Sequence, residues 1–155
     1  MEQELRIEAT GMRPAPKGSY RFVRGHAIPM SKRERPWRTM VKAAAKAAMV
    51  GKNWCHVEKP DCVAVCIAFK IKAPKRLIEK AGTVSPFAAP ANPPDIDKLA
   101  RCVLDALTDA GVWCDDSQVC ELHCTKRYVP TEAEEGAAIT VFHCEGGVVE
   151  TEEWK

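Results

Sequence analysis

The 155-residue sequence lacks an apolar run long enough to cross a bilayer, and its first residues, MEQELRIEATG, lack the pattern of a secretory signal. No internal repeat is visible. We therefore expect a cytoplasmic protein rather than a membrane-bound or secreted one. With 46% hydrophobic and 28% charged residues, wholesale disorder is excluded, and the length suits one globular domain.

The sequence also lacks the paired C-x-x-C spacing of common zinc sites, although it contains eight cysteines. Without an export signal, a disulfide framework is not expected either. The nearest approach to a ligand cluster is Cys120-x-x-His123-Cys124. In a strand, however, His123 would point away from the face that Cys120 and Cys124 share. We therefore expect no structural zinc, and we predict that the cysteines are small, buried free thiols.

Charge is distributed unevenly along the chain. Residues 1–50 carry 11 Lys or Arg against 4 acidic residues, whereas residues 101–155 carry 4 against 12, within a net charge of +2. A basic front half beside an acidic back half predicts a surface for a polyanion and a separate carboxylate-rich feature. Ordinary solvated charge is the alternative.

Apolar spacing predicts an α+β domain over residues 1–144, with a mixed β-sheet of four to five strands and two main helices. Residues 72–94 are basic and proline-rich, which predicts a long flexible loop, and residues 145–155 predict a poorly ordered acidic tail. Arg24-Gly25 predicts the turn of a short hairpin. The expected strands are 5–10, 20–23, 26–29, 62–71, 119–128 and 137–144.

The first helix is expected from the capping-box spacing Ser31–Glu34 to about residue 50, with Gly51 ending it. One face is apolar and consists of Trp37, Met40, Val41, Ala44 and Ala48. Another face carries only positive charge, which is unfavourable unless an anion neutralises it. We predict contact with a DNA phosphate backbone, and a solvated face is the alternative. The expected DNA-binding residues are Lys17, Lys32, Arg33, Arg35, Arg38, Lys42 and Lys46, together with Lys75 and Arg76 of the basic loop.

The second helix is expected over Ile96–Ala110, and acidic residues lie at both of its ends. Asp95 and Asp97 come at its start, and Asp115 and Asp116 follow it. A helix of this length spans about 22 Å. The two clusters can meet only if the chain doubles back after the helix and pairs beside the strand entering Asp95. The apolar face of this helix consists of Leu99, Cys102, Val103, Ala106, Leu107 and Ala110.

A group of aspartates without histidine or thiolate suits Mg²⁺ or Mn²⁺, which can activate water and orient a phosphodiester. The structural alternative is that Asp97 caps the helix, that Asp105 pairs with Arg101, and that Asp115-Asp116 is a turn. We accept a structural role for Asp105 and Asp109. For the remaining aspartates, the residue pattern leaves both interpretations open.

The stretch D-x-D-K-L-x-R-x-x-x-D-A-L-x-x-A-G-x-W-x-D-D-x-Q-V, residues 95–119, resembles the signature of the RusA family of Holliday-junction resolvases. Residues 14–19 and the helix start Pro36-Trp37-Arg38 resemble phage-type members. With the order of strands and helices, the resemblance extends to about Cys144. It implies a RusA-like α+β fold and a homodimer in a bacterial or phage-infected host cell.

The resemblance also implies a Mg²⁺-dependent endodeoxyribonuclease that cuts two strands of a four-way DNA junction in recombination and repair. No membrane partner and no small-molecule cofactor are expected. A flap or branch nuclease of broader specificity is one alternative. A catalytically silent junction-binding protein is another.

The family's metal-binding aspartates fall on Asp95, Asp97 and Asp116, and Asp115 is expected to be an auxiliary ligand. The essential lysine of the family falls on Arg101, which keeps the charge but does not readily lose a proton. Lys98 is the nearest candidate to supply the missing ammonium group. We expect both cations to offset charge in the transition state.

Overall fold

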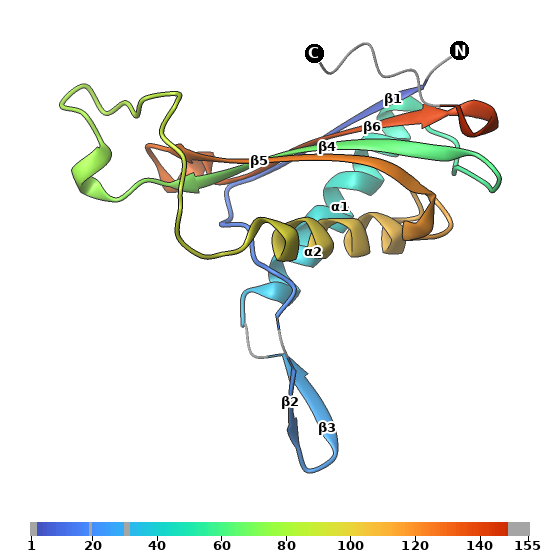
Figure 1. The fold of residues 1–155 in the computed structure, drawn as a ribbon, viewed down its shortest axis with the longest axis horizontal. Coiled ribbons are helices and arrows are strands. Elements are labelled where there is room, and N and C mark those ends of the chain that lie inside the picture. Colours follow the sequence, from blue (N-terminus) through green and yellow to red (C-terminus); the bar gives the residue numbers. More distant parts are fainter. Residues whose placement is uncertain (1–2, 19, 30–31, 149–155) are drawn as a thin grey trace.

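Each expected strand and helix is present in the computed structural model, which describes residues 3–18, 20–29 and 32–148 (Figure 1). Strand bounds differ from the expected ones by one residue at most. Ser31 and residues 149–155 of the expected tail lie outside the described residues. The elements are β1 Glu4–Thr10, β2 Tyr20–Val23, β3 His26–Pro29, α1 Glu34–Lys52, β4 Cys62–Lys72, α2 Ile96–Ala110, β5 Val119–Val129 and β6 Gly136–Cys144.

The main sheet has four strands in the order β1-β6-β4-β5. β4 and β5 are parallel, and the other two pairs are antiparallel, so the predicted mixed α+β fold is confirmed. β2 and β3 form a separate hairpin that extends away from the sheet (Figure 1). Its turn residues, Arg24 and Gly25, both have positive φ angles, as a two-residue turn of this kind requires.

Both helices lie on the same face of the main sheet and pack against each other (Figure 1). In α2, all six predicted apolar positions are buried. In α1, Trp37 and Val41 are buried as predicted, and Met40, Ala44 and Ala48 are half-buried against the core. Ala45, which the sequence analysis did not include, is fully buried as well. α1 also continues past Gly51, because Asn53 takes the left-handed position that ends it.

Parallel strands cannot be joined by a tight turn, and α2 is the crossover between β4 and β5. The helix therefore begins near the edge where the two strands end. Lys126, close to the end of β5, donates to the Pro94 carbonyl at 3.0 Å, just before α2. The helix ends at the opposite edge, where Val63 of β4 pairs with Val119 of β5.

The expected loop over residues 72–94 starts one residue late, since β4 extends to Lys72. It contains one short 3-10 helix, Lys75–Leu77, and is otherwise irregular. It returns to the sheet at Ala88, whose carbonyl accepts from Tyr128 N–H at 3.2 Å. None of the described helices is long and apolar enough to cross a membrane.

Gly136 starts β6 opposite Thr10 with φ +147, and a Cβ there would lie 2.0 Å from the Ala9 carbonyl oxygen. Because this neighbour is backbone, Gly136→Ala should lower the free energy of unfolding by more than about 2 kcal/mol in urea denaturation. Gly51→Ala is the matched control, since Gly51 is helical and its Cβ would meet no neighbouring atom within 4 Å. It should raise stability by up to about 1 kcal/mol. Equal effects of the two changes would contradict this account.

Candidate functional site

Two exposed carboxylates mark the start of α2. Asp95 is the N-cap residue, and its backbone carbonyl accepts from Leu99 N–H at 3.0 Å, but its side chain makes no capping hydrogen bond. Asp97 lies in the first turn, so the structural alternative, in which it caps the helix, is wrong. Both carboxylates face solvent. Neither side chain caps the helix, which leaves both carboxylates available to a ligand.

Three cations lie at the start of α2, where these two carboxylates are. Lys98 Nζ lies 3.3 Å from the Asp95 carboxylate, and both side chains are more than half exposed. Arg101 is also exposed and lies one turn beyond Asp97. Lys126 joins them from β5, because its Nζ donates to the carbonyls of Asn92 and Pro94. No local pattern in the sequence predicts that Lys126 lies here, because the crossover brings it from β5, 29 residues beyond Asp97.

The second acidic pair lies at the other end of α2. Asp115 caps the short 3-10 helix Asp116–Gln118, and its carboxylate accepts from Ser117 N–H at 2.7 Å. This hydrogen bond holds the pKa of Asp115 below its ordinary value. The Asp116 carboxylate accepts from Thr108 Oγ1 and, at 3.3 Å, from Trp113 Nε1. Asp116 is thus attached to the last turns of α2.

The structure therefore does not bring Asp116 to Asp95 within one chain. Thr108, which holds Asp116, follows Asp95 by 13 residues, or about 20 Å of helix. The chain does double back after α2, as the sequence analysis required (Figure 1). However, β5 starts at the far end of α2 and pairs with β4, and the segment before Asp95 is not a strand.

Gln118 holds the turn that carries Asp115 and Asp116. Its side chain is 5% exposed. Its carbonyl oxygen accepts from the backbone N–H groups of Cys114 and Asp115, at 2.8 and 3.0 Å. Its amide nitrogen donates to the carbonyls of Val57 and Asp61, both at 3.1 Å. One side chain therefore ties this turn to the segment before β4.

Two of the expected DNA-binding cations already have acidic partners. Lys17 pairs with Asp105, and both side chains are largely buried. The expected Asp105–Arg101 pair is therefore wrong, because the segment after β1 supplies a nearer cation. Arg38 of α1 donates to the Asp109 carboxylate of α2 at 2.5 and 3.0 Å. Both pairs attach neighbouring segments to α2.

The other expected cations lie on the surface. Arg35 and Lys46 are exposed on α1, and Lys42 is half-buried between them. Lys32, Arg33, Lys75 and Arg76 are also exposed. The basic face of α1 is thus present, although Asp109 partly neutralises the charge of Arg38.

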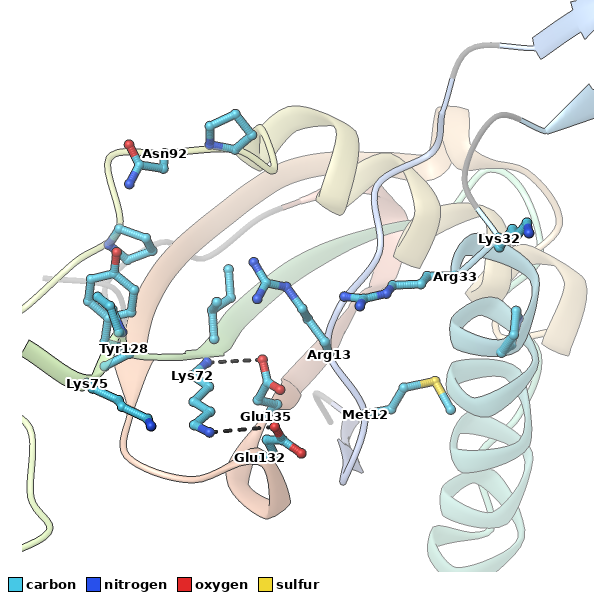
Figure 2. A pocket seen from close by; sticks show the side chains of 16 residues that line it. Met12, Arg13, Lys32, Arg33, Lys72, Lys75, Asn92, Tyr128, Glu132 and Glu135 are labelled. Atoms are coloured by element: carbon cyan, nitrogen blue, oxygen red, sulfur yellow. Dashed lines mark hydrogen bonds and ion pairs between the residues drawn. The ribbon is translucent and has the colours of Figure 1, made fainter. Parts of the chain in front are cut away.

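A cavity of about 780 Å³ opens beside the start of α2 (Figure 2). It lies between the start of α1 and the ends of β4 and β5, and Asn92 and Pro93, just before Asp95, form part of its wall. Five cations line it: Arg13, Lys32, Arg33, Lys72 and Lys75.

Two carboxylates also line the cavity, and both interact with Lys72. Glu132 lies 3.5 Å from Lys72 Nζ, and Glu135 accepts from Lys72 N–H at 3.0 Å (Figure 2). The cavity keeps an excess of positive charge, and Tyr128 offers it an aromatic ring. Sequence analysis missed Arg13 and Tyr128.

The family model for endodeoxyribonuclease RusA matches residues 11–141, most of the chain. The chain belongs to the RusA family of endodeoxyribonucleases. The resemblance seen at residues 95–119 is thereby confirmed. No curated protein matches the chain in sequence.

Membership in the RusA family implies an endonuclease that resolves Holliday junctions and a partner that is branched DNA. The donors at the start of α2 fit a hard divalent cation, because Asp95 and Asp97 offer carboxylate oxygens and no softer ligand accompanies them. Two carboxylates supply only part of an octahedral shell. Further oxygen ligands must come from water, DNA or another carboxylate.

The cysteines of this RusA family member depart from the sequence prediction. All eight are free thiols, and Cys102 and Cys144 are buried as expected. Burial raises the pKa of Cys102 to about 12, so this thiol stays protonated. Cys55, Cys114 and Cys120, however, are exposed, so the prediction of burial is wrong for them. They lie in a turn or at a sheet edge, where a small side chain is not forced inward.

Gln118→Leu tests the clamp beneath Asp115 and Asp116. The change removes the side-chain partner of two N–H groups and two carbonyls, of which the Val57 carbonyl keeps only the weak Cys114 thiol donor, so stability should fall by about 2–4 kcal/mol in urea denaturation. Gln3→Leu makes the same substitution at an exposed glutamine and should change stability by less than about 0.5 kcal/mol. Similar effects at the two positions would show that the clamp does not stabilise the fold.

Proposed function

We propose that this protein is a Mg²⁺-dependent, structure-selective endonuclease that resolves four-way DNA junctions as a homodimer, by paired phosphodiester hydrolysis. One observation carries the proposal. In a chain of the RusA family, Asp95 and Asp97 are exposed carboxylates beside a basic cavity. Such a pairing suits the chemistry of a phosphodiester, because carboxylates hold the metal while cations receive the DNA backbone.

The metal ligands in this proposal come from two subunits. Asp95 and Asp97 of one subunit, with Asp116 of the partner subunit, hold Mg²⁺ or Mn²⁺. The separation of Asp116 from Asp95 by most of α2 supports this arrangement, because one ion cannot bind carboxylates about 20 Å apart. Asp115 serves as an auxiliary ligand through the oxygen that does not accept from Ser117.

The bound metal would supply activation of water and neutralisation of charge on the scissile phosphate. The chain's own cations act on the same phosphate. Arg101 grips two of its oxygens, since a guanidinium can donate two parallel hydrogen bonds. Lys98, adjacent to Asp95, provides the ammonium group that the family's lysine would otherwise supply. Both offset negative charge that develops in the transition state.

The basic cavity and the basic face of α1 receive the arms of the junction. Lys32 and Arg33 connect the two, because they line the cavity and lie at the start of α1. Lys75 and Arg76 extend the basic surface along the loop after β4. Two-fold symmetry of the homodimer matches the two equivalent phosphates of a two-fold-symmetric junction.

A complementation experiment tests the shared site. Asp97→Asn and Asp116→Asn should each lower cleavage of a labelled four-way junction by more than about 100-fold in Mg²⁺ while leaving binding intact. Co-expression of the two variants should restore nicking, because every mixed dimer has one site with all its aspartates. At equal expression of the two variants, about a quarter of all active sites have the complete set of aspartates. Because no dimer has two intact sites, the products are single rather than paired nicks.

Sites contained within one chain would leave the co-expressed mixture inactive, and full activity of Asp116→Asn would remove Asp116 from the ligand set. A linear duplex and a flap should be assayed beside the junction. Paired cuts confined to the junction are expected from wild-type protein. Equal cutting of the flap would indicate a broader branch nuclease, and binding without cutting in Mg²⁺ and Mn²⁺ would indicate a silent junction-binding protein.

The salt dependence of junction binding tests the DNA surface. The logarithm of the affinity of Asp97→Asn should fall steeply with the logarithm of salt concentration. Adding Arg35→Gln or Lys46→Gln should reduce that slope by about one each, since each removes one phosphate contact. Arg6→Gln, on β1 and paired with Glu4, is the control and should leave the slope unchanged. A flat salt response would contradict the proposed surface.

A further inference from the structure

A second group of ligand-type side chains lies apart from Asp95 and Asp97. Among the described residues, His56, Glu58 and Cys114 form a group whose ligand atoms all lie within 4.8 Å of one another. The Cys114 thiol lies 3.0 Å from His56 Nε2 and 3.2 Å from a Glu58 carboxylate oxygen. His56 Nε2 lies 3.7 Å from the other Glu58 oxygen. The junction-cleaving function proposed above does not use this group.

Backbone pairing explains why the three side chains meet. Val57 and Trp113 form an isolated parallel β-bridge, and both are 1% exposed. Because neighbouring residues of extended chain point to opposite sides, His56 and Glu58 on either side of Val57 point outward together. Cys114, next to Trp113, points outward beside them. The three ligands therefore share one exposed face across the bridge.

The backbone that carries them is held in place. Val57 N–H donates to the Val112 carbonyl at 3.2 Å. Gln118 accepts from Cys114 N–H and donates to the Val57 carbonyl, so one buried side chain spans both segments. The two ligand-bearing segments cannot separate without breaking these bonds, which preorganises the group.

A further hydrogen bond determines which nitrogen of His56 is free. Its Nδ1 lies 2.7 Å from the Gly111 carbonyl, and a carbonyl only accepts, so Nδ1 carries the proton. Nε2 then presents its lone pair toward Cys114. Histidine ligands of protein metal sites commonly have this arrangement, in which the second ring nitrogen donates to a backbone carbonyl and orients the ring.

We propose that His56, Glu58 and Cys114 form a binding site for Zn²⁺, contrary to the expectation from the sequence, because His56 and Glu58 lie far from Cys114 along the chain and only the fold brings them together. One sulfur, one nitrogen and one carboxylate oxygen suit a borderline-soft cation and not Mg²⁺. Ordinary zinc–ligand bonds at tetrahedral angles place neighbouring donor atoms about 3.4–3.6 Å apart. The Cys114 sulfur lies 3.0 Å from His56 Nε2 and 3.2 Å from one Glu58 oxygen, and His56 Nε2 lies 3.7 Å from the other Glu58 oxygen. Each separation is therefore within about half an ångström of that range. The group is exposed, which leaves a fourth position to water.

Bound zinc would add a metal-mediated link between two segments that the bridge, Gln118 and the hydrogen bonds of Trp54, His56 and Val57 to the backbone carbonyls of residues 111 and 112 already hold together. One is the segment between α1 and β4, and the other is the turn between α2 and β5. That turn continues directly into Asp115 and Asp116. The ion therefore acts as a staple beneath the second acidic pair, chemically distinct from the carboxylates at the start of α2.

Cobalt(II) absorption tests the site in the full-length chain, reduced and freed of metal. Co²⁺ should bind as one equivalent at micromolar concentration, with a sulfur-to-cobalt charge-transfer band that Zn²⁺ abolishes by displacement. Cys114→Ser should remove that band, and His56→Gln should weaken binding at least about tenfold. Cys55→Ser, a nearby exposed cysteine outside the group, is the matched control and should keep both the band and the affinity.

Thermal unfolding supplies the second readout. Zn²⁺ should raise the melting temperature of the wild-type and Cys55→Ser proteins but raise that of Cys114→Ser much less, and Cys114→Ser without metal should melt close to wild type. A thiolate band that survives in Cys114→Ser would assign the metal to other cysteines. Absence of binding at micromolar Co²⁺ and Zn²⁺ by the wild-type protein would likewise overturn the proposal. Neither outcome bears on junction cleavage, because the aspartates are unchanged in these variants.

Discussion

The parallel pairing of β4 and β5 is the constraint on which the rest of the structure depends. Parallel neighbours need a crossover, and α2 is that crossover. Its first turn must therefore lie near the edge where both strands end, and its last turn near the edge where they begin. Asp95 and Asp97 lie at one edge and Asp115 and Asp116 at the other, although the signature motif of 25 residues contains them all.

The two edges have different chemistry. At the edge where the strands end, exposed carboxylates lie among cations, beside a cavity whose two glutamates are already engaged by Lys72. The carboxylates at this edge suit a hard metal ion, and the cations beside them suit DNA phosphates. At the opposite edge, Gln118 fixes a turn and a bridge that expose histidine, thiol and carboxylate groups together. A softer cation suits that arrangement.

Charge pairs explain why the basic half of the sequence is only partly a binding surface. Lys17 and Arg38 look equivalent to Lys46 in the sequence, yet each meets an aspartate of α2 across a packed contact. Ion pairs of this kind join segments that are far apart in the chain, so no local sequence pattern predicts them. The reverse holds for Lys126, which a strand of the acidic half brings to the start of α2.

Local patterns were enough for the strands, both helices, the apolar face of α2 and the hairpin turn at Arg24-Gly25, because backbone geometry and side-chain periodicity act over a few residues. The signature at residues 95–119 was enough to identify the family. Helix length already placed Asp116 far from Asp95 unless the returning chain brought them together, and strand pairing decided that it does not. Long-range packing also gave Lys17 its partner and exposed Cys114 beside His56. Those outcomes depend on which strands pair and in which direction, and hydrogen bonding between distant segments settles that choice.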